Sequence, residues 1–93
     1  MPGPSVPPVK VATWNLWWRF GPWEARQPAI VETLRQADAD LVCLQEVWAE
    51  EDGPDQAADL AAALGLHHVR SSTPFRAGVA FGNTVGWRPV SSW

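Results

Sequence analysis

Positive charge is scarce in this sequence. Lys and Arg together number 7 against 10 Asp and Glu, which gives a net charge of −3 over 93 residues. A chain with this balance lacks the positive field that holds a protein on nucleic acid or on an anionic membrane by electrostatics alone. Any phosphate substrate would therefore need a bound cation.

Cysteine and long apolar segments are also scarce. The single cysteine, Cys43, excludes an internal disulfide, lies in an apolar run typical of a buried thiol, and has no second cysteine at zinc-binding spacing. No apolar stretch approaches the roughly 20 residues that a membrane-spanning helix needs. Residues 1–8 contain four prolines and no signal-peptide pattern. They predict a disordered proline-rich leader, with a cytoplasmic location as the default.

The remaining composition is that of a globular domain. Hydrophobic residues make up 46% of the chain and charged residues 18%, which excludes an intrinsically disordered chain. A chain of this length is one domain at most, and it can bury only roughly 60–65% of the surface of its unfolded state. The core is therefore expected to be small.

The first half of the chain predicts a βαβ unit. Val9–Leu16 and Leu41–Val47 have the apolar, β-branched character of covered strands, and Glu24–Ala37 between them has helical spacing. The right-handed crossover rule makes the two strands parallel, so Asn15 and Glu46 both fall at carboxyl ends of strands. Ligands of open α/β sheets bind at that edge.

The rest of the chain predicts further short elements. In chain order we expect an acidic turn over Ala49–Asp55, a helix over Gln56–Leu64 that stops at Gly65, a strand over His67–Ser71, a turn over Ser72–Gly78 and a strand over Val79–Val85. Gly82 within the last strand indicates a bulge or a close backbone contact. Pro28 is expected in the first turn of its helix, or else it kinks that helix.

Two polar side chains at the predicted strand ends are the candidates for chemistry. Glu46 ends an otherwise apolar strand, and a carboxylate there must be solvated, paired or bound to a metal. Asn15 offers an amide oxygen and two N–H donors to a hard cation or a phosphate oxygen. A capping or surface glutamate and a turn-forming asparagine are the simpler alternatives. As a pair they form part of a hard-cation shell that water and substrate phosphate could complete.

The segment after Asn15 is dense in aromatic residues. Trp17–Trp23 (WWRFGPW) has a Gly-Pro pair in its middle and predicts a loop. Its rings could stack a base or a lipid headgroup, or they could cover a sheet face, which is the interpretation that we favour. Arg19 in this loop is a candidate substrate contact through phosphate, with a solvated surface charge as the alternative.

Three stretches of the sequence resemble a known family. They are VATWNL over Val11–Leu16, DADLVCLQEV over Asp38–Val47, and the later pair Gly82-Asn83. Over Val9–Asn83 the chain is similar to the opening of the endonuclease/exonuclease/phosphatase superfamily, which has the DNase I-like fold. The resemblance implies an α/β fold, the N-terminal part of a four-layer αββα sandwich beginning with a βαβ unit. It also implies Mg²⁺-dependent hydrolysis of phosphodiester or phosphomonoester bonds, with Mn²⁺ as a second candidate metal.

The resemblance assigns roles to individual residues. It makes Glu46 the metal ligand and places Asn15 beside the metal and the scissile phosphate as a second ligand, with both residues catalytic. Gln45 supports the metal site from the neighbouring position, and Asn83 belongs to the supporting Gly-Asn pair. The implied substrates are nucleic acids, nucleotides or phospholipids, and the full-length parent is expected to be a monomer.

Several family motifs have no counterpart in this sequence. Residues 84–90 depart from the family pattern, and its Gly-Asp-x-Asn motif and C-terminal Asp-His pair are absent. His67 and His68 match neither motif and are interpreted as satisfied or surface side chains. We therefore expect residues 9–93 to be a truncated N-terminal half of the domain, inactive or weakly active alone. The alternative hypothesis is a non-catalytic binding module or remnant that uses the tryptophan-rich loop.

Overall fold

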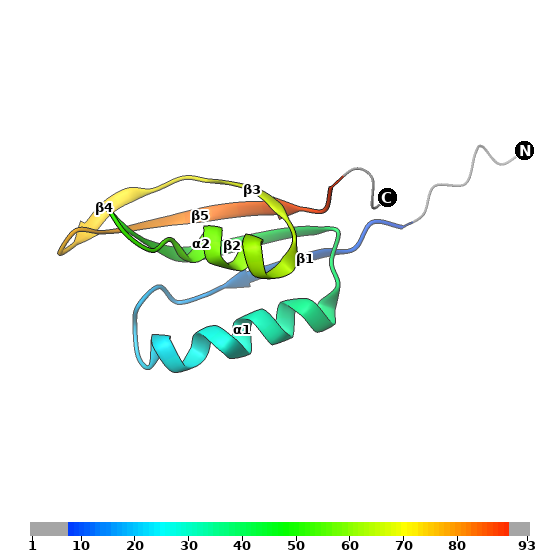
Figure 1. Ribbon diagram of the computed structural model, residues 1–93, viewed down its shortest axis with the longest axis horizontal. Coiled ribbons are helices and arrows are strands. Elements are labelled where there is room, and N and C mark those ends of the chain that lie inside the picture. The colour runs from blue at the N-terminus through cyan, green and yellow to red at the C-terminus, as the bar shows by residue number, and fades with distance from the viewer. Residues whose placement is uncertain (1–7, 90–93) are drawn as a thin grey trace, which may run out of the picture.

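The computed structural model describes residues 8–89 as one mixed sheet with two helices (Figure 1). Residues 1–7, which make up nearly all of the predicted leader, and residues 90–93 lie outside the described part of the chain. The elements are β1 (Val11–Asn15), α1 (Trp23–Ala37), β2 (Leu41–Glu50), α2 (Gln56–Leu64), β3 (His67–Arg70), β4 (Thr73–Arg76) and β5 (Val79–Trp87). No helix within residues 8–89 is long and apolar enough to cross a membrane.

The predicted βαβ unit is confirmed. β1 and β2 pair in parallel, with Val11 opposite Leu41 and Asn15 opposite Gln45, and α1 connects them. β5 pairs antiparallel with the other side of β2, and β3 and β4 both pair with the far side of β5. β2 and β5 are therefore the central strands, and β1 lies at one edge of the sheet (Figure 1).

Local signals set the helix ends. α2 has the predicted bounds because the Asp55 side chain accepts a hydrogen bond from the Ala58 amide at its start and Gly65 adopts a left-handed conformation at its end. α1 begins at Trp23, one residue before the predicted start. Pro28 lies in its second turn, so the first-turn placement is wrong and the helix lacks the backbone hydrogen bond that this residue cannot donate.

Both helices pack on one face of the sheet. Ile30 and Leu34 of α1 and Leu60 of α2 are buried against Val42 and Leu44 of β2. A second, smaller cluster contains Trp18, Trp48 and Val79, with partly buried aromatic rings around it. The aromatic loop therefore extends the core past the end of β1, as the packing interpretation predicted.

The opposite face of the sheet is open over residues 8–89. Val11, Val69 and Val85 are 56%, 59% and 37% exposed, and cross-strand pairing aligns Val85 with Val69 on one side and with Cys43 on the other. Cys43 is a free thiol and is half-buried on this face, whereas the sequence predicted a buried one. Side chains that point to this face are reachable from solvent.

Two predicted turns are shorter than expected. β2 continues past Val47 to Glu50, because residues 47–50 pair with residues 79–82 of β5. The segment expected to be a turn over 72–78 contains β4, which pairs with β5 and leaves only Ala77 and Gly78 as the hairpin turn. The partner of the extended part of β2 is distant along the chain, so local composition did not indicate it, whereas β4 pairs with β5 across a two-residue turn that the sequence predicted as longer.

Candidate functional site

The Glu46 carboxylate does not lie on the buried face of the sheet. Val42 and Leu44 are each 4% exposed and pack against the helices, so strict alternation along β2 would bury Glu46 beside them. Glu46 instead accepts a hydrogen bond from the side chain of Asn15, which lies exposed on the open face. The prediction that Glu46 ends its strand is wrong, because β2 runs four residues further.

A β-bulge produces this change of face. The register between β2 and β5 shifts between Leu44 and Val47, where two residues of β2 face Asn83 alone. Glu46, the second of these two residues, has a φ of 55° in the left-handed region. A non-glycine residue in that region costs of the order of 1–3 kcal/mol, and such strained residues cluster at functional sites. The bulge moves a carboxylate from the buried face of the sheet to its open face.

Asn15 is oriented by two neighbours. Its Nδ2 donates to the Glu46 carboxylate, and its Oδ1 accepts from the backbone amide of Trp17 at 2.9 Å. The reversed amide would place Oδ1 against a carboxylate and Nδ2 against an N–H, so these two partners fix the orientation. Asn15 therefore positions Glu46, and it retains one N–H and one oxygen lone pair for a ligand.

Gln45 holds the bulge from the open face. Its Nε2 donates to the Thr13 hydroxyl at 3.1 Å and to the Cys43 carbonyl at 3.2 Å. Its backbone carbonyl accepts from the Leu16 amide at 2.8 Å, and the Glu46 carbonyl accepts from the Trp18 amide at 2.7 Å. The sequence did not single out Thr13, although its position two residues before Asn15 puts both side chains on the same face.

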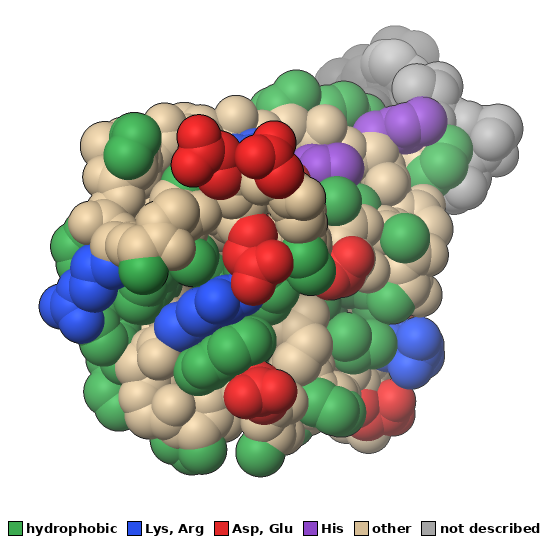
Figure 2. Space-filling model, turned by 60° about the vertical axis from the view of Figure 1, so that its left-hand side comes forward, with side chains coloured by type: hydrophobic (Ala, Val, Ile, Leu, Met, Phe, Trp, Pro, Cys, Tyr) green, Lys and Arg blue, Asp and Glu red, His purple; other side chains and the backbone are tan. Residues whose placement is uncertain are grey.

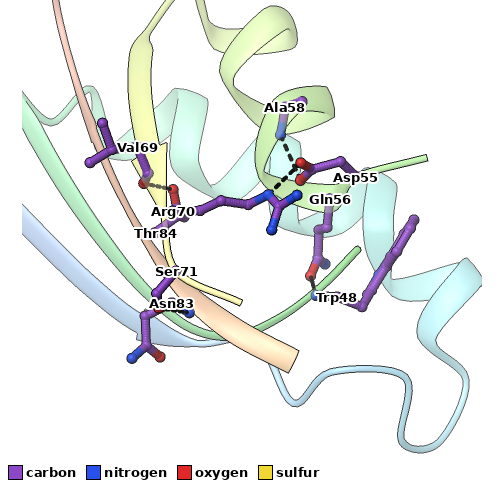
Figure 3. Close-up of polar contacts among 9 residues, drawn as sticks. All are labelled: Trp48, Asp55, Gln56, Ala58, Val69, Arg70, Ser71, Asn83 and Thr84. Carbon is purple, nitrogen blue, oxygen red and sulfur yellow. Dashed lines mark hydrogen bonds and ion pairs between the residues drawn. The ribbon is translucent and has the colours of Figure 1, made fainter. Parts of the chain in front are cut away.

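Asn83 lies opposite the bulge and is bonded to the β3–β4 junction. Its backbone amide donates to the Ser71 hydroxyl at 3.3 Å, and its backbone carbonyl accepts from the Ser71 backbone amide at 2.9 Å (Figure 3). The expected close contact at Gly82 is confirmed, because a Cβ there would stand 1.9 Å from the Ser71 carbonyl oxygen. The structure thus brings Asn15, Gln45, Glu46 and Asn83 together on adjacent strands.

Arg19 makes its contacts inside the protein. Its guanidinium pairs with Glu50 at 2.8 Å and lies 4.2 Å from the ring centroids of both Trp23 and Trp48. The side chain is 17% exposed. These contacts within the protein account for the arginine in this loop, with no need for a substrate. Contact of Arg19 with phosphate stays a prediction.

Positively and negatively charged side chains lie close together on the surface. Figure 2 shows Asp and Glu side chains next to Lys or Arg side chains on the face that it views. The ion pairs Arg19–Glu50 and Arg70–Asp55, at 2.8 and 2.6 Å, place opposite charges in contact. A cleft of about 550 Å³ lies between the β4–β5 hairpin and the end of β2, and its lining does not include Glu46. The candidate site therefore lies on the open face of the sheet, outside this cleft.

The two histidines lie away from the site. Cross-strand register places His67 beside Trp87, and Trp87 beside Leu41 at the start of β2. Leu41 precedes Gln45 by four residues. About 13 Å along β2 therefore separates the position level with His67 from the site residue Gln45. His68 lies one position further along, level with Gly86 and Val42, and His67 is exposed while His68 is half-buried.

The donor set suits a hard divalent cation that keeps much of its hydration shell. Mg²⁺ is commonly bound by one or two carboxylates together with water and substrate phosphate. Residues 8–89 contain no group of three or more His, Cys, Asp or Glu side chains placed to bind a metal together. The described residues would therefore contribute the Glu46 carboxylate and the remaining lone pair of Asn15 Oδ1.

Comparison with known proteins identifies the family and supports the fold. The profile of the Endonuclease/Exonuclease/phosphatase family matches residues 12–90, whereas none of the curated proteins matches significantly. A solved endonuclease/exonuclease/phosphatase from Beutenbergia cavernae is 27% identical with a TM-score of 0.61, over 86% of this chain and 26% of its own. A family protein from Leptotrichia buccalis is 17% identical with a TM-score of 0.69, over 87% of this chain and 38% of its own.

A third solved structure has a stated activity and ligand. ANGEL2, a 2′,3′-cyclic phosphatase in complex with adenosine-2′,3′-vanadate, is 23% identical with a TM-score of 0.62, over 86% of this chain and 27% of its own. The present chain thus spans 26–38% of the length of these three proteins. The matches confirm the predicted α/β fold class of the DNase I-like kind. The chain belongs to the Endonuclease/Exonuclease/phosphatase family.

Proposed function

We propose that this chain carries the metal-binding edge of a Mg²⁺- or Mn²⁺-dependent phosphoesterase. The observation that supports the proposal most directly is the strained bulge that turns the Glu46 carboxylate toward Asn15 on the open face. A surface or capping glutamate needs no such conformation, because an ordinary strand position would expose it at no backbone cost. Family membership supports the same activity class.

Each residue of the edge has a defined task in this proposal. Glu46 would hold the cation, and Asn15 would keep the carboxylate oriented through Nδ2 while directing its second N–H toward a phosphoryl oxygen. Gln45 would keep the bulge in register through its bond to Thr13. The bound cation would supply charge stabilisation for the phosphoryl oxygens and the leaving group.

The proposed substrates are phosphate esters. The chain has a net charge of −3 and no basic groove is needed for a small ester, since the cation attracts the phosphate. ANGEL2 supports this class, because its complex holds an adenosine-2′,3′-vanadate. The described residues place no histidine beside Glu46, so binding of metal and phosphate is a sharper test of this chain than turnover.

The first prediction concerns metal-dependent stability. Mg²⁺ that binds only the folded state at about ten times its dissociation constant would add about 1.4 kcal/mol, which raises the Tm of a chain of this size by roughly 6–11 °C. The Glu46→Gln variant should lose this shift. Glu32→Gln is the matched control, because Glu32 is an exposed glutamate of α1 that pairs with Arg35 away from the bulge.

Paramagnetic Mn²⁺ locates the ion directly. The amide signals of Asn15, Gln45 and Glu46 should broaden first in a titration followed by proton–nitrogen NMR. An unchanged Tm shift in Glu46→Gln, or broadening centred on the acidic turn over residues 51–55, would refute the assignment of Glu46. A chain that shows neither a shift nor broadening would favour the non-catalytic binding module.

A further inference from the structure

Trp17 is an exposed aromatic residue two positions after Asn15, and its backbone is bonded to the candidate site. Trp17 as a residue is 53% exposed, whereas Trp18 is 6% exposed and packs in the second core cluster. The Trp17 backbone amide donates to Asn15 Oδ1 at 2.9 Å, so its backbone is bonded to one of the site residues. Trp17 lies outside the second core cluster, although its ring centroid is 6.1 Å from that of Phe20.

The loop holds Trp17 in a costly conformation. Its φ is 63°, in the left-handed region that L side chains rarely adopt. A Cβ on Gly21 would stand 2.8 Å from Trp17 Cζ3, so the close approach of the ring requires a glycine there. The Arg26 guanidinium lies 5.3 Å from the ring centroid and donates to the carbonyls of Phe20 and Trp18 at 2.9 and 3.1 Å. These contacts fix the ring while much of it stays in water.

We propose that Trp17 is a stacking platform that binds the base of a nucleotide-type phosphate ester whose phosphate lies at Glu46 and Asn15. This inference rests on the proposed function, which supplies the phosphate site. An exposed indole presents a π-face that stacks on any nucleobase, and a ring held in place before binding loses little freedom when the base arrives. Substrates with a base would then be favoured over phosphate esters without one.

A phospholipid headgroup is the competing occupant. Membrane-inserting tryptophans usually act with cationic neighbours that attract anionic lipid. This chain has a net charge of −3, and an acidic turn with Glu51 and Asp52 follows β2. The guanidinium of Arg26 is engaged with the ring and with loop carbonyls. These observations favour a base over a lipid surface.

The test compares AMP with ribose 5-phosphate, which carries the same phosphate but no base. Both are titrated calorimetrically in the presence of Mg²⁺ into the 93-residue chain. We expect AMP to bind about tenfold or more tightly than ribose 5-phosphate. The ratio should fall to near one in Trp17→Ala and Trp17→Gly and recover partly in Trp17→Phe. Trp17→Gly also relieves the left-handed strain, so it separates loss of stacking from misfolding.

A matched control and the vesicle assay complete the test. Phe75→Ala removes another exposed aromatic ring, 46% exposed on β4, and should keep the preference for AMP. Equal affinities in the wild type, with binding still dependent on Glu46, would overturn the platform and leave the phosphoesterase proposal standing. Failure of both probes to bind would overturn both proposals. Trp17-dependent binding to phosphatidylcholine vesicles without a preference for AMP would assign the ring to lipid instead.

Discussion

Replacing Gly82 by alanine should destabilise the protein strongly. The added Cβ would stand 1.9 Å from the Ser71 carbonyl oxygen, 2.8 Å from the Ser71 carbonyl carbon and 3.0 Å from Ser72 Cα. All three atoms belong to the backbone, so the β3–β4 junction must move away from β5. This movement would break the two hydrogen bonds between Ser71 and Asn83.

The expected loss is about 3–5 kcal/mol. Overpacking typically costs about 1–3 kcal/mol, and each of the two hydrogen bonds contributes about 1 kcal/mol. A domain of this length has a free energy of unfolding of about 5–14 kcal/mol, so the substitution removes a large fraction of it. The Tm should fall by about 12 °C or more.

Urea unfolding followed by tryptophan fluorescence measures this loss, since the chain contains seven tryptophans. Gly65→Ala is the control: a Cβ there meets nothing within 4 Å, and only its φ of 67° opposes the substitution. The control should lose about 1–2 kcal/mol. A loss in Gly82→Ala no greater than in Gly65→Ala would refute the argument from backbone contact. The Gln45 and Glu46 amide signals should also shift in Gly82→Ala alone, because Asn83 lies opposite the bulge.

Two further substitutions test contacts that hold the fold around the site. Arg19→Met should cost about 2 kcal/mol because it removes the stacking on Trp23 and Trp48 together with the ion pair to Glu50. Arg19→Lys should restore only part of this, since lysine keeps the charge but lacks the planar group. Thermal unfolding that ranks lysine equal to arginine would contradict the stacking. Asp55→Ala should cost about 1–2 kcal/mol through loss of the α2 cap. Asp55→Asn keeps the cap and loses mainly the partly exposed ion pair with Arg70 (Figure 3). Equal losses for the two Asp55 variants would show that the ion pair, and not the cap, is the main contribution.

The sequence alone determined the elements whose signals are local. The bounds of α2 follow from an aspartate that can cap the helix and a glycine that can end it, and both act within one helical turn. The order of β1, α1 and β2 follows from periodicity and from the handedness of the crossover. These features also place Asn15 and Gln45 on neighbouring parallel strands.

Only the tertiary structure decided which face receives the Glu46 carboxylate. Alternation along β2 predicts a buried position, and the bulge that reverses it depends on pairing with β5, whose residues lie more than thirty positions later in the chain. The same long-range pairing extended β2 to Glu50, where the carboxylate meets Arg19. Register between distant strands is set by the packing of the whole sheet, so no local pattern around Glu46 could determine where its side chain points.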